Sequence, residues 1–241
     1  MEEIKLGIYA FGVGRMPEAA PDGEKLRLQR LCLICGGEGT YVSGNEEKKF
    51  GPDKFYLFPS GFHGRINSSV DNPVSAVYFD FFTVPPIVSK EPAVYSVREG
   101  SPLKILSYDI KSLVAEIGPE RSDKVNETVK KCLFHLLFEL SREKEVPYLK
   151  DEVINSAIDY IRSNYQNNLS VGELAKKMNF ERHYFIRRFR DAVNETPYAY
   201  IKSCRIMMAK EYLARGSSYD EAAEKVGYKN GKTLWNLMHK K

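Results

Sequence analysis

One ten-residue segment, Glu181 to Arg190, concentrates the side chains of this sequence that are best suited to contact phosphate. It carries four arginines and one glutamate, without interleaved acidic partners. At helical spacing, Phe185 and Phe189 share one side and a second set falls on or near another face. That second set is Arg182, His183, Ile186, Arg187 and Arg190. Such a helix can pack with one side and enter a DNA major groove with the other, although a charged run can also be only a solvated face.

The residues around this segment predict how it is positioned. Ser170 is followed three residues later by Glu173, which indicates a capping box and a helix that starts at Val171. Asn179 is suited to a left-handed turn, and a second helix follows from about Glu181. The stretch from Leu169 to Asn194 therefore predicts a helix-turn-helix.

A weaker copy of the same unit follows. The pattern at 173–180 aligns with the pattern at 221–228 at a shift of 48 residues. Between the copies, a long helix is predicted from about Pro197 to a stop at Gly216. At ~1.5 Å per residue, about 19 residues span roughly 28 Å, close to the ~34 Å between successive major-groove faces. A rigid spacer of this length could hold two recognition helices.

The motifs LSVGELAKKMNF…YFIRRF, N-E-T-P-x-x-Y, R-x-x-x-A-x-x-Y-L and A-x-x-V-G-Y resemble the DNA-binding domain of AraC-family transcription regulators over about residues 150–241. The resemblance implies base-reading positions in the first copy at His183, Ile186 and Arg187, with Arg182 and Arg190 near phosphate. In the second copy it implies Gly231, Lys232, Trp235 and Asn236. Arg187 is the first choice for a base contact because a guanidinium can bridge guanine O6 and N7, and a contact to phosphate alone is the alternative.

The second copy departs from the family pattern. The family continues past the second recognition helix, whereas this sequence ends at Lys241, and Met238 stands where the first copy has Phe189. We therefore expect a C-terminally shortened, marginally stable second copy in which Trp235 could be a packing residue. DNA contact would then rest mainly on the first copy or require a dimer.

The first hundred residues predict a small barrel or sandwich, with short β-rich runs separated by turns. The runs are Leu26–Ile34, Gly39–Val42, Phe55–Phe58, Val74–Phe82 and Ala93–Val97. Gly51–Asn67 resembles the second half of the cupin signature, and the strands around it resemble the sensor barrels of AraC-family regulators. A small-molecule effector is the implied ligand, for example a sugar.

The candidate effector contacts combine aromatic and polar side chains, although most could equally be barrel core or surface. They are Tyr9, Tyr41, His63, Arg65 and Tyr78. His63 is the only histidine in the first 130 residues, so we expect no metal, no cofactor and no enzyme activity. Cys32 and Cys35 lie three apart in a predicted strand, which puts them on opposite faces and argues against a metal or redox pair.

Residues 101–146 predict two amphipathic helices, separated by Gly118-Pro119. Their apolar stripes could cover the barrel or a partner subunit, and the AraC resemblance implies a dimer interface here. Ser141–Asp151 is charged and interrupted by Pro147, which is typical of a linker.

Charge and composition fit this division. Residues 1–150 hold 20 Lys and Arg against 21 Asp and Glu, whereas residues 151–241 hold 16 against 11. The N-terminus lacks an apolar run of signal-peptide length, and no window is long enough to span a membrane, so we expect a cytoplasmic protein.

The sequence thus predicts an α+β, two-domain protein: a cupin-like effector-binding β-barrel (jelly roll) at 1–100, a helical dimerisation and connection segment at 101–146, and an all-α double helix-turn-helix at 147–241. The predicted function is an effector-controlled transcription regulator that binds promoter DNA as a homodimer and could contact RNA polymerase. A shortened regulator that acts by protein pairing without specific DNA binding is the alternative, and a cupin enzyme is a third. Effector, operator and the sense of regulation stay open.

Overall fold

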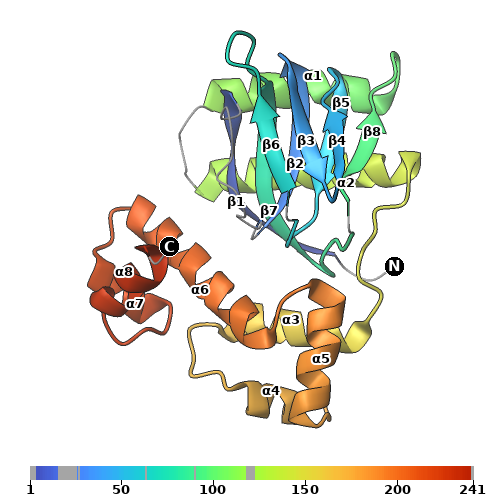
Figure 1. Cartoon of the computed structure of the whole chain (residues 1–241). Coiled ribbons are helices and arrows are strands. Elements are labelled where there is room, and N and C mark those ends of the chain that lie inside the picture. The colour runs from blue at the N-terminus through green and yellow to red at the C-terminus, as the bar shows by residue number, and fades with distance from the viewer. Residues whose placement is uncertain are drawn as a thin grey trace. The chain divides into compact units, whose positions relative to one another are not determined.

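The structure, a computed structural model, describes residues 4–15, 26, 28–62, 64–89, 91–117 and 123–239. The chain divides into two compact units, Met1–Tyr148 and Leu149–Lys241. The first contains two sheets and two helices, and the second is all helical, as Figure 1 shows. The predicted α+β, two-domain fold class is confirmed.

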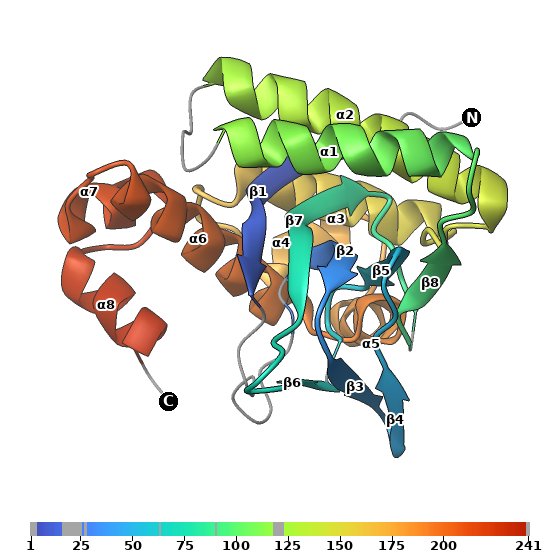
Figure 2. The same ribbon diagram turned by 90° about the horizontal axis from the view of Figure 1, so that it is seen from above.

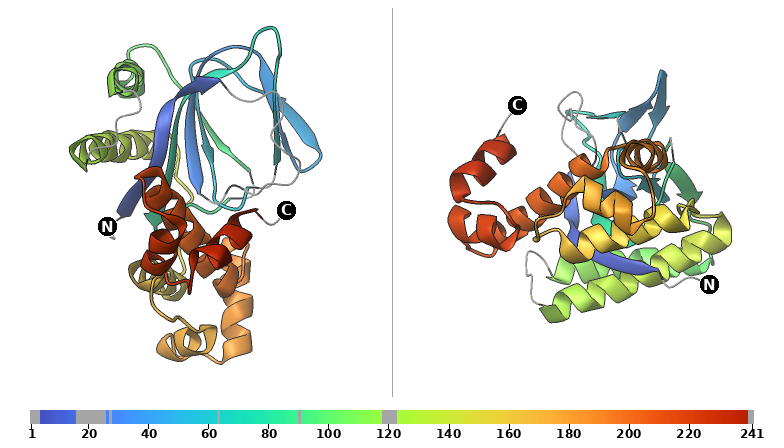
Figure 3. Two further views of the ribbon diagram at one scale, coloured as in Figure 1. Left: turned by 90° about the vertical axis from the view of Figure 1, so that its left-hand side faces the viewer. Right: turned by 90° about the horizontal axis from the view of Figure 1, so that it is seen from below.

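The N-terminal unit is built on two antiparallel sheets. The larger sheet has the order β1 (Lys5–Arg15), β7 (Ser75–Val84), β2 (Gln29–Gly36), β5 (Lys54–Phe58), β8 (Ala93–Ser96). The smaller sheet has the order β4 (Glu46–Lys49), β3 (Gly39–Ser43), β6 (Gly64–Ser68). The left view of Figure 3 shows the smaller sheet facing the larger one. The described strands thus form two facing sheets of a cupin-like sandwich, without pairing all round into a closed barrel.

Alternation along the strands gives the larger sheet two apolar faces. Leu31, Leu33 and Phe79 point to one face and pack with Leu133 and Leu137 of a helix layer. That layer consists of α1 (Pro102–Ile117) and α2 (Asp123–Glu143), which lie side by side along the sheet in Figure 2. The amphipathic stripes predicted for these helices therefore cover the sheet.

The other face of the larger sheet meets the smaller sheet through aromatic side chains. The Tyr41 ring centroid lies 5.2 Å from Phe50, 5.8 Å from Tyr56 and 6.0 Å from Phe58. All four rings are buried, as are Cys32 and Ile34 beside them. Edge-to-face packing of this kind adds to the burial energy. This second core fills the space between the two sheets, where the sequence predicts that the effector binds, and it is called the sensor interior for that predicted role.

Three strands were not predicted from the sequence. β1 is rich in glycine, and β4 consists of charged residues only. β6 contains Asn67, the last residue of the segment that resembles the cupin signature. Each of these strands is held by backbone hydrogen bonds to a neighbouring strand: β1 pairs with β7, and both β4 and β6 pair with β3. Helix α2 ends at Glu143, so its last turn overlaps the first residues of the predicted linker Ser141–Asp151.

The described part of the C-terminal unit, up to His239, contains six helices: α3 (Glu152–Asn164), α4 (Val171–Lys177), α5 (Arg182–Val193), α6 (Pro197–Ala214), α7 (Tyr219–Lys225) and α8 (Gly231–His239). The long helix α6 serves both halves. Near its start Tyr200 packs edge-to-face on Phe189 of α5, and near its end Ala209 packs with Ala222 and Leu234. Its 18 residues correspond to about 27 Å. Within the described residues, no helix is long and apolar enough to cross a membrane.

Candidate DNA-binding surface and sensor interior

The first helix-turn-helix is α4 and α5 with a tight turn between them. Ser170 caps α4, its hydroxyl accepting from the Glu173 amide at 3.1 Å. Asn179 adopts the left-handed conformation that the sequence predicts, with φ of 58°. The Phe180 amide then donates to the Ala175 carbonyl at 2.9 Å. These local bonds turn the chain sharply and fix the angle at which α5 leaves.

A glutamate starts the recognition helix. Glu181 accepts from the amides of His183 at 2.7 Å and Tyr184 at 3.0 Å. The hydrogen bond from the Tyr184 amide is the main cause that lowers the pKa of Glu181. The carboxylate also faces the positive end of the helix dipole. The first turn of α5 is thereby held in place beside the residues predicted to read DNA.

Four of the five residues predicted for DNA contact in the first copy line one groove on α5. The groove has a volume of about 530 Å³. Its lining is His183, Ile186, Arg187, Arg190, Asp191, Asn194 and Thr196. Arg182 is exposed at the start of the same helix, outside that lining. Spacing of three and four residues brings these side chains to one face, and Phe185 and Phe189 are fully buried on the other.

The remaining arginine of the segment has a structural partner. Arg188 makes a two-point ion pair with Asp151, and its guanidinium lies 5.1 Å from the ring centroid of Phe180. It therefore anchors α5 to the start of α3 and the turn.

The second helix-turn-helix repeats this geometry. Ser218 and Glu221 form the full reciprocal capping box at α7, with the Ser218 amide donating to Glu221 at 2.7 Å. Gly227 occupies the left-handed position with φ of 80°, and the Tyr228 amide donates to the Ala223 carbonyl at 2.8 Å. The two copies of the internal sequence repeat therefore share the same N-cap and turn hydrogen bonds.

On α8, Lys232, Trp235 and Asn236 are exposed at positions i, i+3 and i+4, so they share one face. Trp235 is 49% exposed and stacks on His239 with ring centroids 4.5 Å apart. Both the indole and the amide of Asn236 are thus accessible to a partner.

Gly231, the fourth position predicted in the second copy, is placed differently. It is buried, its amide donates to Asp220 at 2.7 Å, and a Cβ there would lie 2.8 Å from the Asp220 amide nitrogen. The close approach of α7 and α8 explains the glycine at this position.

One arginine ties the two halves together through α6. Arg205 donates to the carbonyls of Tyr165 and Asn167, both at 2.7 Å, and its guanidinium lies 5.3 Å from the ring centroid of Tyr228. The loop between α3 and α4 is thereby joined to the turn of the second helix-turn-helix. Sequence reasoning missed this residue, because its partners lie about 20 to 40 positions away.

The sensor interior holds a charged pair that sequence reasoning also missed. Arg30 of β2 is paired in register with Asp80 of β7, and its guanidinium donates to the carboxylate at 2.6 and 2.8 Å. The hydrogen bond to Asp80 raises the pKa of Arg30, so the guanidinium keeps its positive charge at neutral pH. The available signal was strand parity, because Arg30 shares the interior face with Cys32 and Ile34.

Tyr78 lies next to this pair. Its ring centroid is 5.6 Å from the Arg30 guanidinium carbon, and its cross-strand neighbour in β1 is Gly12. A Cβ at Gly12 would lie 3.2 Å from the Tyr78 hydroxyl, so the glycine leaves room for the ring. Arg30, Asp80 and Tyr78 are each only partly buried. A polar, partly accessible cluster therefore lies at one side of the aromatic core.

Of the other predicted effector contacts, Tyr41 belongs to the interior core against which Tyr78 packs. Tyr41 is 4% exposed within the aromatic core, and Tyr9 lies at a bulge in β1, between Ile8 and Ala10. Arg65 is exposed and has the opposite parity to Ile66, which packs into the interior, so its position on the outer face is at odds with the predicted role. His63 lies outside the described residues.

The cysteine prediction agrees with the structure, since Cys32 is buried and Cys35 is exposed. Burial raises the pKa of the Cys32 thiol to about 12, which leaves it protonated and unreactive at neutral pH. The part of the chain that the structure describes contains no group of three or more His, Cys, Asp or Glu side chains suited to a metal ion.

Comparison with known proteins agrees with the geometry of the C-terminal unit. Residues 174–240 match the family model described as a helix-turn-helix domain. A 78-residue stretch is 31% identical to the transcriptional regulatory protein HptR of Staphylococcus aureus, covering 32% of this chain and 31% of HptR. The chain thus matches about a third of that relative's length. The lactose operon transcription activator of Staphylococcus xylosus is 22% identical over 214 residues, or 83% of this chain and 75% of the relative.

The C-terminal unit therefore carries a helix-turn-helix domain of the AraC type, as the sequence resemblance predicts. The chain is similar in fold to ToxT from Vibrio cholerae. The two superpose with a TM-score of 0.60 over 98% of this chain and 94% of ToxT, at 10% sequence identity.

Proposed function

We propose that this chain regulates transcription by reading a specific double-stranded promoter site, chiefly with α5, under the control of a small molecule bound in the sensor interior. The single observation that carries the proposal is the groove that gathers His183, Ile186, Arg187 and Arg190 on the outer face of α5. Two of these side chains are guanidinium groups, which can read guanine or neutralise phosphate. Lys232, Trp235 and Asn236 of α8 supply a second face for contact.

Selection of binding sites from a random DNA pool at near-physiological salt tests this proposal. The native chain should enrich a defined motif, and Arg187→Ala should weaken binding by about 1–3 kcal/mol and relax one position of that motif. Arg98→Ala, which removes one exposed arginine of the N-terminal unit, is the matched control and should leave the motif unchanged. Failure of the folded native chain to enrich any motif, with and without candidate effectors, would favour a regulator that acts by pairing with another protein.

A homodimer would present two such domains to paired half-sites. Support for an interface comes from α1 and α2. Ile105 and Tyr108 of α1 are 62% and 57% exposed, and a groove of about 570 Å³ with Leu106, Leu113 and Cys132 in its lining runs between the two helices. Sedimentation of the native chain and of Leu113→Glu would test the interface, since a buried carboxylate should dissociate the dimer. Contact with RNA polymerase is a further expectation of this role.

The chemistry of the sensor interior favours an uncharged, hydroxyl-bearing effector such as a sugar. ToxT has been crystallised with a bound unsaturated fatty acid, whereas the Staphylococcus xylosus relative is named for the lactose operon. In this chain the positive charge of Arg30 is already neutralised by Asp80. The pair offers both donors and acceptors to hydroxyl groups, and Tyr78 offers an aromatic face.

The effector would act by shifting the population of domain arrangements that can bind DNA. DNA affinity of the native chain should change in the presence of the correct neutral sugar and should not respond to fatty acids. Tyr78→Ala should remove the response to the sugar while DNA binding in its absence is retained. A sugar panel that leaves both DNA affinity and transcription unchanged would contradict this coupling.

A further inference from the structure

A pocket on the helix-covered side of the N-terminal unit has a chemistry different from that of the sensor interior. It lies between the start of β1 and helix α2 and has a volume of about 640 Å³, within the usual range for small-molecule sites. Ile4, Lys5 and Leu6 line it from β1. Glu127, Lys130, Lys131, Phe134, His135 and Phe138 line it from α2.

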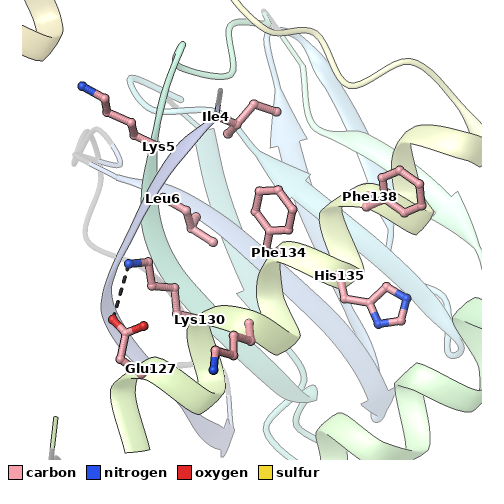
Figure 4. Close-up of a pocket in the computed structure, with 9 residues that line it drawn as sticks. Ile4, Lys5, Leu6, Glu127, Lys130, Phe134, His135 and Phe138 are labelled. Carbon is pink, nitrogen blue, oxygen red and sulfur yellow. Dashed lines mark hydrogen bonds and ion pairs between the residues drawn. The ribbon is translucent and has the colours of Figure 1, made fainter. Parts of the chain in front are cut away.

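The apolar part of this pocket is unusually exposed. Phe134 and Phe138 are one helical turn apart on α2 and are 48% and 51% exposed, although Leu133 and Leu137 beside them are buried in the core. Figure 4 shows the two rings and the side chain of Ile4 together at one end of the pocket. Single exposed apolar side chains are common on protein surfaces, whereas a group of them in one pocket is typical of a binding surface.

The other part of the pocket is cationic. Three lysines line it against one glutamate, and the Lys130 ammonium lies 3.4 Å from Glu127 in an exposed pair. An exposed ion pair at this distance is weak, and three lysines against one glutamate give this part of the pocket a net positive charge. In Figure 4 the ammonium groups of Lys5 and Lys130 lie toward the side opposite the two rings. Lys131 adds a further cation from the next position of α2.

We propose that this pocket binds a small amphipathic carboxylate, with its alkyl chain on Phe134 and Phe138 and its carboxylate near Lys130 and Lys131. An apolar floor that ends in ammonium groups matches an alkyl chain that ends in one negative charge. A neutral sugar would make little use of the two exposed aromatic rings, and a purely apolar molecule would make no use of the positive charge of the pocket. The site is distinct from the sensor interior because Leu6 belongs to the core that faces α1 and α2, whereas Arg30 and Asp80 face the smaller sheet.

Calorimetric titration of the full chain with decanoate tests the proposal, with decan-1-ol and acetate as probes that each lack one feature. Decanoate should saturate one site per chain, and both other probes should bind at least tenfold more weakly. Phe134→Ser should weaken decanoate binding by about tenfold or more, because it removes the apolar contact of one aromatic ring. Lys131→Glu should weaken it several-fold and in a salt-dependent manner.

Two control variants separate the pocket from general surface effects. Val70→Ser removes an exposed apolar side chain of the same unit outside the lining, and Lys144→Glu reverses an exposed charge just past the end of α2. Both should bind decanoate as the native chain does. Circular dichroism should show all four variants folded, since each side chain is at least partly exposed.

Three outcomes would overturn the inference. Equal binding of decan-1-ol and decanoate would show an apolar surface without anion recognition. Decanoate binding that no pocket variant alters would place the ligand elsewhere, including the sensor interior. A change in sedimentation of Phe134→Ser without any decanoate binding by the native chain would assign the pocket to a second copy of the chain.

Discussion

Asp151 and Arg188 join the first helix of the DNA-binding unit to its recognition helix. Arg188 of α5 donates from Nε at 2.8 Å and from Nη2 at 3.1 Å to the two carboxylate oxygens of Asp151. Asp151 is also the N-cap of α3 and accepts from the Ile154 amide at 3.1 Å. One carboxylate therefore caps one helix and orients the helix that carries the groove proposed to contact DNA.

We predict that Asp151→Asn and Asp151→Ala separate these two roles. Asparagine caps helices well, so Asp151→Asn should lose only the partly exposed ion pair, at a cost of up to about 1 kcal/mol. Asp151→Ala should cost about 1 kcal/mol more, because the cap is lost as well. Urea unfolding monitored by circular dichroism measures both. Equal losses for the two variants would contradict the division.

The ion pair should also show in the pH dependence of stability. Burial raises the pKa of Asp151, but the hydrogen bonds from Arg188 and the backbone amides outweigh it, so the pKa is lowered overall. A lowered folded-state pKa contributes stability above the unfolded value near 3.9, and that contribution is lost as the pH falls through the folded value. The stability gap between the native chain and Asp151→Asn should be constant from about pH 7 to 5 and shrink below about pH 4.

Two glycines of the DNA-binding unit should respond oppositely to alanine. Gly227 has φ of 80°, and a Cβ there would collide with the backbone carbonyl of Gln166. Gly227→Ala should destabilise the unit by about 2 kcal/mol or more. Gly172 lies in α4 with open space around it, so Gly172→Ala should stabilise by about 0.5–1 kcal/mol. Thermal unfolding of the two variants checks this, and a neutral Gly227→Ala would mean that the turn can relax.

Removing one member of the Arg30–Asp80 pair should cost more than removing both. The side chains are 32% and 14% exposed, so Arg30→Leu leaves a largely buried carboxylate without its partner and should cost about 2 kcal/mol. Arg30→Leu combined with Asp80→Leu should recover part of that loss. Arg98→Leu, which breaks the more exposed pair with Glu143, is the control and should cost less than about 1 kcal/mol. Additive losses in the double variant would argue against coupling.

The single tryptophan reports whether α8 touches DNA. Trp235 is half-exposed on the predicted reading face of the second copy. Binding of the selected duplex should shift its fluorescence emission to shorter wavelength, because water leaves the indole. A duplex without the motif, at the same salt, should leave the emission nearly unchanged. An unchanged spectrum at saturating specific DNA would show that recognition rests on α5.

Features of the DNA-binding unit could be predicted from the sequence because their causes are local. A cap such as Ser170, a left-handed residue such as Asn179 and the buried stripe of Phe185 and Phe189 act within one or two helical turns. The internal repeat supports the same prediction independently, because residues 221–228 repeat the pattern of residues 173–180. Even so, the complete reciprocal capping box forms at Ser218 and Glu221, whereas the sequence predicts it at Ser170 and Glu173.

The sensor unit depended on contacts between distant residues. β1 is held by β7, some 70 positions away, so its glycine-rich sequence carries no strong signal by itself. Strand register decided that Arg30 meets Asp80 inside the sandwich, and parity turned Arg65 outward. The amino-acid sequence by itself thus determined the helices, turns and arginine-rich face of the DNA-binding unit. Only the tertiary structure decided which polar side chains share the sensor interior, because a β-strand residue acquires its neighbours from other strands.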